Sequence, residues 1–210
     1  MGSVKLVSIS PDTENLISYC ARVSNPSNQE NYDTAPKLLR YCIKHKHWSP
    51  FEMANMVLEV NTTRSISAQI LRHRSFSFQE FSLRYATAIG SPVVPEIRLQ
   101  DHKNRQNSVE VDDDGFASYF ASKARDLFEQ QIALYEEMIA NGVAKEIARD
   151  VLPLATPTRL YMNGTIRSWI HYIDLRVGNG TQKEHRLLAE EAKQIFCTQL
   201  PVIAEALEWL

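Results

Sequence analysis

Helical spacing covers most of this 210-residue chain, whereas β-prone runs are few, short and scattered. Alternating apolar residues predict strands over 4–9, 56–60 and 158–162. The chain lacks the regular alternation of strand, helix and strand that builds a parallel sheet. The pattern therefore predicts an α+β fold with a small central sheet flanked by several helices. We expect residues 1–210 to form a single domain, because a chain of this length can bury one sizeable core.

The other periodic segments have the spacing of amphipathic helices. The longest, 116–140, is closed by Asn141-Gly142, and a shorter helix follows it to Val151. Residues 89–115 contain two prolines and three consecutive aspartates, and they predict a surface excursion. Further helices are predicted after an N-cap at 11–13 and over 35–46, 63–71, 166–175 and 183–210.

The overall charge narrows the class of ligand. A formal net charge of −2 argues against a general binder of nucleic acid or anionic membranes, which needs an excess of cations. Arginine outnumbers lysine by 14 to 9 among the 23 basic residues, and arginine is the better bidentate ligand for phosphate. We therefore expect small anionic ligands.

The location follows from what the sequence lacks. We see no signal peptide and no apolar run of the roughly 20 residues that cross a bilayer. The three cysteines, Cys20, Cys42 and Cys197, are far apart and have no metal-ligand spacing. We expect reduced, structural thiols in a cytoplasmic protein.

One segment concentrates charge among aromatic residues: R-H-R-S-F-S-F-Q-E-F-S-L-R-Y, residues 72–85. An extended chain would point Arg72 and Arg74 the same way, and Gln69 could share a helix face with Arg72 and His73. Forked guanidinium groups suit phosphates or pyrophosphates. The alternative is that these arginines pair with carboxylates such as Glu52 and Glu80 in a buried network. Since the P-loop and G-x-G-x-x-G patterns are absent, side chains must hold any nucleotide or flavin.

The motif R-H-R followed after seven residues by S resembles the flavin-dependent thymidylate synthases, the thymidylate synthase complementing protein family. Arg72-His73-Arg74 and Ser82 match it, and further elements occur in the family's order. They are H-x-S-P-F-E at 47–52, Gln69, R-x-x-L-P at 149–153, and the run from Thr165 through His171 to Arg176. Together they span most of the chain.

The resemblance implies methylation of dUMP to dTMP with FAD, methylenetetrahydrofolate and NADPH. It implies FAD contacts from residues in three parts of the chain: Ser49, Arg72, His73, Arg74, Glu80, Thr165, Arg167 and His171. It implies dUMP contacts from a second, overlapping set: Gln69, Arg72, Glu80, Ser82, Leu83, Arg84, Arg149 and Arg176. Arg84 and Arg149 would hold the phosphate, and the sites would be shared between the subunits of a homotetramer.

Two of these residues are the catalytic candidates. Arg176 would lie beside the uracil, where a fixed cation can stabilise developing negative charge. Ser82 has no obvious adjacent base, so we expect it to hydrogen-bond the nucleotide rather than attack it. None of the cysteines has an activating histidine or helix N-terminus in its sequence context. We therefore assign no metal and no covalent thiolate to this chain.

Some positions stay open. His73 and His171 could be core histidines, and His47 could cap a helix rather than approach folate or flavin. Met53 and Gly180 depart from relatives that carry histidine there. The competing hypotheses are a non-catalytic nucleotide- or flavin-binding module and a metal-dependent hydrolase using His45, His47 and His73, which lacks paired metal ligands.

Overall fold

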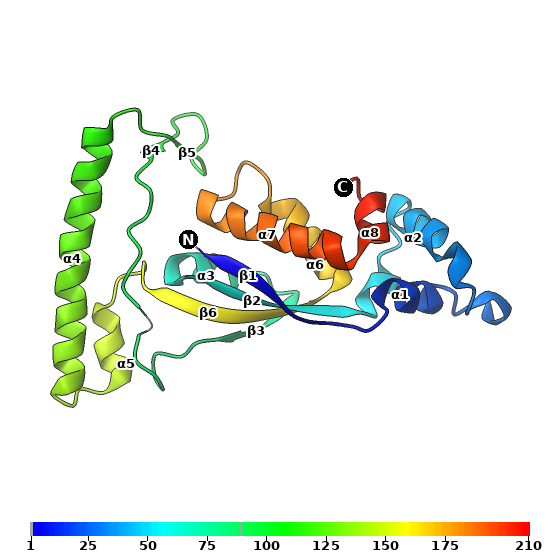
Figure 1. The fold of residues 1–210 in the computed structure, drawn as a ribbon, viewed down its shortest axis with the longest axis horizontal. Coiled ribbons are helices and arrows are strands. Elements are labelled where there is room, and N and C mark those ends of the chain that lie inside the picture. Colours follow the sequence, from blue (N-terminus) through cyan, green and yellow to red (C-terminus); the bar gives the residue numbers. More distant parts are fainter. Residues whose placement is uncertain (1, 89) are drawn as a thin grey trace.

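A four-stranded antiparallel sheet in the order β1-β2-β6-β3 forms the centre of the molecule (Figure 1). The computed structural model describes residues 2–88 and 90–210. The strands are β1 (Ser3–Ile9), β2 (Asn55–Thr63), β3 (Phe76–Glu80) and β6 (Pro157–Thr165). The combination of a small central antiparallel sheet with many helices confirms the α+β class.

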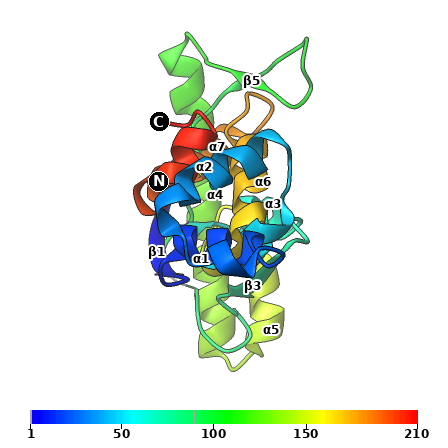
Figure 2. The same ribbon diagram turned by 90° about the vertical axis from the view of Figure 1, so that its right-hand side faces the viewer.

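Helices cover one face of this sheet (Figures 1 and 2). Leu58 and Met162 point from the central strands into a core shared with Trp169 and Phe196. The helices are α6 (Ile166–Arg176), α7 (Lys183–Gln199) and α8 (Pro201–Ala206), with α1 (Thr13–Ala21) and α2 (Ala35–Lys44) at one end. Short 3-10 turns occupy Pro26–Asn28, Tyr32–Thr34 and Ser49–Glu52, the last of which is η3.

The opposite face of the sheet is open to solvent. Its side chains alternate with those of the core because successive strand residues point to opposite faces. Most of them are polar or amphipathic, and they include Lys5, Ser77, Gln79, Tyr161 and Asn163, all exposed. The helices predicted to flank the sheet therefore lie on one side of it.

The long helix α4 (Asp114–Ala140) stands apart from the sheet (Figure 1). The Asp113 carboxylate caps it by accepting hydrogen bonds from the backbone N–H groups of Gly115 and Phe116 at 2.9 and 3.0 Å. Tyr135 is its one buried residue. It packs against the extended segment 90–98 and against α5 (Lys145–Ala148) and the 3-10 turn η4 (Arg149–Val151).

Several sequence predictions were wrong in detail. The helix predicted over 63–71 is α3 (Arg64–Ile70), so Arg72 and His73 follow it in a turn and share no helix face with Gln69. Asp12 precedes α1 in a left-handed conformation without a side-chain cap. The predicted excursion also contains a hairpin, β4 (Leu99–Gln100) with β5 (Ser108–Val109). Its first residue, Ile89, and residue Met1 lie outside the described residues.

Among the described residues, no helix is both long and apolar enough to span a bilayer.

Candidate active site

The turn 72–75 joins α3 to β3 and is fastened to α6. The backbone N–H of His73 donates to Ile70 O at 3.0 Å, and Ser168 Oγ donates to Ser75 O at 3.2 Å. Phe76 then lies over Gly164 of the neighbouring strand, where an added Cβ would come within 2.4 Å of the ring. Glycine at this position therefore lets β3 begin directly beside the start of α6.

Arg72 and Arg74 are both exposed in this turn. Within residues 2–88 and 90–210, neither guanidinium makes an ion pair or a side-chain hydrogen bond. Glu52 and Glu80 pair with other arginines. The buried ion-pair network considered for Arg72 and Arg74 is therefore wrong, and their donors face solvent, where an anionic ligand can reach them.

His73 contacts the cation predicted to act in catalysis. Arg176 Nε donates to His73 Nε2 at 2.9 Å. Burial and then the charge of Arg176 lower the pKa of His73 to about 4, so the imidazole is neutral near pH 7. Because Nε2 accepts, the single proton of His73 belongs on Nδ1.

Gln69 belongs to the same group of side chains because it contacts His185, a residue to which we assigned no role. His185, fully buried, places Nδ1 3.2 Å from Gln69 Oε1 and Nε2 3.0 Å from the Tyr172 hydroxyl. Its ring centroid is 6.4 Å from that of His73. Sequence reasoning missed His185 because it contacts Gln69 across 116 positions, and no local motif marks such a contact. We call Gln69, His73, Tyr172, Arg176 and His185 the inner cluster.

The residues predicted to bind flavin gather beside this cluster. Arg167, on α6, pairs with Glu52 of η3. The rings of Trp48 and His171 pack edge to face, with their centroids 5.2 Å apart. Thr165 caps α6 by accepting from the backbone N–H of Ser168 at 3.2 Å. Seven of the eight predicted FAD contacts therefore lie on the turn 72–75, on η3 or at β6–α6: Ser49, Arg72, His73, Arg74, Thr165, Arg167 and His171.

This arrangement has the chemistry that a flavin nucleotide requires. Two unpaired guanidinium groups suit a pyrophosphate, and adjoining rings suit an aromatic ring system. The fit rests on the uncompensated charge of Arg72 and Arg74 in a turn that Ser168 Oγ ties to α6, the helix that carries the exposed His171.

Glu80, the eighth predicted FAD contact, lies at the far end of β3. Its Oε1 accepts from Ser67 Oγ at 2.7 Å and Thr158 Oγ1 at 2.9 Å, and it pairs with Arg64 Nη1 at 3.1 Å. The carboxylate thus ties β3 to α3 and β6. Contacts of Glu80 with FAD or dUMP remain predictions.

The predicted phosphate ligands meet on α5. Arg84 Nη2 pairs with Glu146 Oε2 at 3.1 Å, and Arg149 Nε donates to Glu146 O at 3.2 Å. Lys145 Nζ holds the same loop by donating to Tyr85 O at 3.0 Å. The structure therefore brings Arg84 and Arg149 together around Glu146; with Ser82 they form what we call the α5 cluster.

Ser82 and Leu83 belong to the loop that carries Arg84 and help to fix its conformation. Ser82 Oγ accepts from the Arg84 backbone N–H at 3.3 Å, which closes a tight turn. Leu83 is only 7% exposed, so its side chain packs inward and its backbone is the part available to a ligand. A nucleotide contact from either residue stays a prediction.

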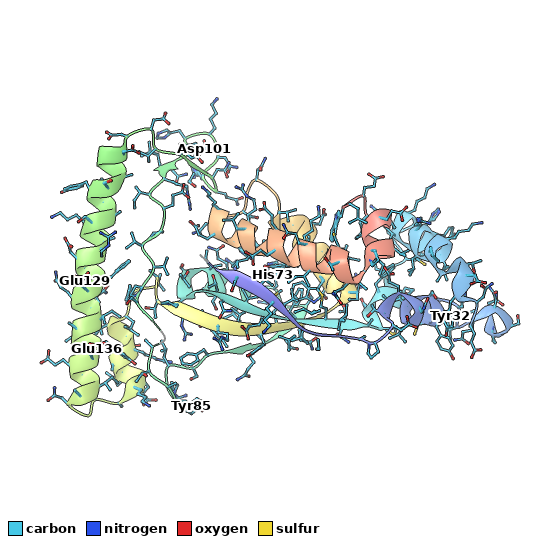
Figure 3. All side chains as sticks on the ribbon, viewed as in Figure 1. Tyr32, His73, Tyr85, Asp101, Glu129 and Glu136 are labelled. Atoms are coloured by element: carbon cyan, nitrogen blue, oxygen red, sulfur yellow. The ribbon has the colours of Figure 1, made fainter. Side chains whose placement is uncertain are left out.

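The inner cluster and the α5 cluster lie at opposite ends of β3. Figure 3 shows His73 beneath α7 and Tyr85 farther toward α5. Five extended residues span about 17 Å, so one chain does not bring Ser82 to Arg176. A largely apolar cavity of about 490 Å³ lies elsewhere, between the ends of β2 and β6 and α7, and contains none of the predicted site residues.

The thiols show no sign of activation. All three cysteines are free, and burial raises the pKa of Cys42 and, against the charge of Lys193, of Cys197. A raised pKa disfavours the nucleophilic thiolate. These two cysteines therefore behave as packing residues.

Exposed arginines beside a hydrogen-bonded polar cluster, on a small antiparallel sheet, are the features of a site for a small anionic ligand, and comparisons with known proteins specify the class of enzyme and its family. Residues 5–202 match the family model described as thymidylate synthase complementing protein. The probable flavin-dependent thymidylate synthase of Paramecium bursaria Chlorella virus 1 is 52% identical over 99% of this chain and 100% of the relative. The flavin-dependent thymidylate synthase of Synechocystis is 55% identical over 93% of this chain and 90% of the relative.

A solved structure agrees. The UMP/dUMP methylase PolB from Streptomyces cacaoi, bound with 5-Br dUMP, superposes with a TM-score of 0.86 at 28% identity, covering 99% of this chain and 95% of that one. The chain therefore belongs to the thymidylate synthase complementing protein family, the flavin-dependent thymidylate synthases.

Proposed function

We propose that this protein makes dTMP by reductive methylation of dUMP, with methylenetetrahydrofolate as carbon donor, FAD as hydride carrier and NADPH as reductant. The balance is dUMP, methylenetetrahydrofolate, NADPH and a proton giving dTMP, tetrahydrofolate and NADP⁺. One observation carries the proposal: Arg72 and Arg74, which have no ion-pair partner in the part of the chain that the structure describes, flank His73, a neutral imidazole that accepts a hydrogen bond from Arg176.

The cofactor side of the proposal uses the turn 72–75 and α6. Bound FAD supplies the hydride that completes the methyl group. Arg72 and Arg74 would hold its phosphates, while Arg167 and His171 would orient the remainder. His73 carries its proton on Nδ1 and offers this donor on the side away from Arg176.

The substrate side divides between the two clusters. Gln69 and Arg176 would contact the uracil, and Arg84 and Arg149 would bind the phosphate. Negative charge must develop on the ring for C5 to attack the methylene carbon. The guanidinium of Arg176, held by His73, can stabilise that charge without reorganising.

We also propose a homotetramer with shared sites. The α5 cluster of one subunit would complete the inner cluster of a neighbour, because β3 holds the two apart within one chain. The single core and the match over 5–202 support one domain over residues 1–210. Three free thiols support a cytoplasmic location.

The direct test follows tritium released to water from C5 of labelled dUMP. Turnover should require FAD, methylenetetrahydrofolate and NADPH together, and omission of each in turn should abolish it. A non-catalytic module would turn yellow with FAD and bind dUMP, yet release no tritium. That result would refute the proposed activity.

A further inference from the structure

A series of hydrogen bonds joins Gln69 to the Glu184 carboxylate through Gln182. Arg98 donates to Glu184 through Nη2 at 2.9 Å and lies 2.7 Å from its other oxygen through Nη1. Burial opposes ionisation of Glu184, but hydrogen bonds led by that from Arg98 lower its pKa below the ordinary 4.5. Glu184 is therefore a carboxylate, which only accepts hydrogen bonds.

That carboxylate sets the direction of two side-chain amides. Gln182 must donate Nε2–H to Glu184 Oε2, 2.8 Å away, so its oxygen faces Gln69. Gln69 then donates Nε2–H to Gln182 Oε1 at 2.7 Å and turns its own oxygen toward His185. Reversing Gln69 would require Gln182 to reverse too, which would set its oxygen against the Glu184 carboxylate.

The other end of the chain fits the same direction. Burial and then the charge of Arg176 lower the pKa of His185 to about 3, so the ring is neutral and carries one proton. The oxygen of Gln69 can only accept, which puts this proton on Nδ1. Nε2 therefore accepts from the Tyr172 hydroxyl, whose pKa burial raises.

Every donor in this series points toward Glu184: Tyr172 to His185, His185 to Gln69, Gln69 to Gln182, and Gln182 to Glu184. Gln69 keeps one amide N–H and one oxygen lone pair free, in fixed positions. A side-chain amide that cannot turn over presents only one donor and acceptor pattern.

We propose that this relay makes Gln69 a reader of uracil against cytosine, with His185 and Gln182 as positioning residues. The inference rests on the proposed contact between Gln69 and dUMP. Uracil offers an N3–H donor beside a C4 carbonyl acceptor, whereas cytosine offers an N3 acceptor beside an amino donor. A fixed amide complements one of these edges and leaves unpaired groups against the other. An amide that is free to turn over can pair with the edge of either base.

The test measures dissociation constants of dUMP and dCMP for the FAD-loaded protein by calorimetry. Gln182→Ala, at an exposed residue, removes the link between Gln69 and the Glu184 carboxylate, so the Gln69 amide can turn over, and the ratio of the two constants should narrow about tenfold, the effect of roughly 1.4 kcal/mol. His185→Phe keeps that link and an aromatic ring but removes the donor to the Gln69 oxygen, so it should narrow the ratio less. His185→Asn can still donate to Gln69 and should retain most of the wild-type ratio.

The outcomes separate the relay from simple packing. Equal weakening of dUMP and dCMP by His185→Phe and Gln182→Ala would overturn the inference. So would a wild-type protein that binds both nucleotides equally, or an unchanged ratio in Gln69→Ala. In each case tritium release from dUMP still judges the proposed activity, so the failure of one idea is distinguishable from the failure of the other.

Discussion

The clusters at the two ends of β3 differ in how their side chains are held in place. The inner cluster is ordered by burial: His185 has no exposed surface, and its partners are held at 3.0 and 3.2 Å. In the α5 cluster the paired side chains of Arg84 and Glu146 are 58% and 53% exposed. Exposed ion pairs contribute at most about 1 kcal/mol, so Glu146 restrains Arg84 only weakly.

The contrast indicates which part of the site is preorganised. The end assigned to the base is held by buried hydrogen bonds before a ligand binds, as recognition of a flat hydrogen-bonding edge requires. The end assigned to the phosphate consists of long, solvated side chains that can exchange Glu146 for an anion. Substitutions in the two clusters should therefore fail in different ways.

The largest effect should come from Arg176→Ala. Loss of a fixed cation beside the base should lower kcat/KM for dUMP by about a hundredfold, for a charged hydrogen bond of roughly 3 kcal/mol, while bound flavin stays. Arg74→Ala is the matched control. It should weaken flavin binding tenfold or more, as measured by a spectral titration, because it loses a charged hydrogen bond of about 1.5 kcal/mol. The assignment is reversed if Arg176→Ala empties the flavin site and Arg74→Ala keeps it full.

Arg84→Ala should have the next largest effect. It should raise KM for dUMP about tenfold, because one phosphate contact of roughly 1.4 kcal/mol is lost, with little change in thermal stability. Glu146→Ala frees Arg84 from its partner and is the control, expected to leave KM within about threefold, since exposed pairs are weak. A large loss of stability in Arg84→Ala would show that the pair is structural instead.

The buried histidine should make stability depend on pH. His185 has a folded pKa of about 3, below its ordinary 6.5, so the unfolded state binds more protons between these values. Stability should therefore fall as pH drops below 6.5, with His185 contributing at most about 1.4 kcal/mol per pH unit and His73, whose folded pKa is about 4, adding a similar slope. Urea unfolding from pH 7 to 5 should show the combined slope in the wild type and a shallower one in His185→Asn. Parallel slopes would mean that His185 already carries a proton when folded.

The smallest effect should come from the thiols. Replacing Cys20, Cys42 and Cys197 one at a time by alanine should leave turnover within a few-fold of the wild type, because no activated thiolate takes part. A hundredfold loss in any folded single variant would contradict the flavin-dependent mechanism.

The sequence predicted the class of fold and its main elements better than it predicted how the candidate site residues are arranged. Strand and helix periodicity placed β1, β2, β6 and the long α4 correctly, because burial of one face fixes the apolar spacing. The end of α3 at Ile70 depends on how the turn 72–75 packs against α6, which no local pattern encodes. His185 was assigned no role for the same reason. Its role depends on contacts with Tyr172 and Gln69 that only the folded chain creates.

The central claim is that each site joins the inner cluster of one chain to the α5 cluster of another. At low dUMP, Arg84→Ala and Arg176→Ala are expected to lose about tenfold and about a hundredfold in the rate of tritium release. Unfolding and refolding them together should raise the rate above the mean of the two parents, because one site of a hybrid pair then holds both lesions and the other holds none. Refolded mixtures that contain hybrids by native mass spectrometry, yet are no more active than the mean of the two parents, would show that the site is built within one chain.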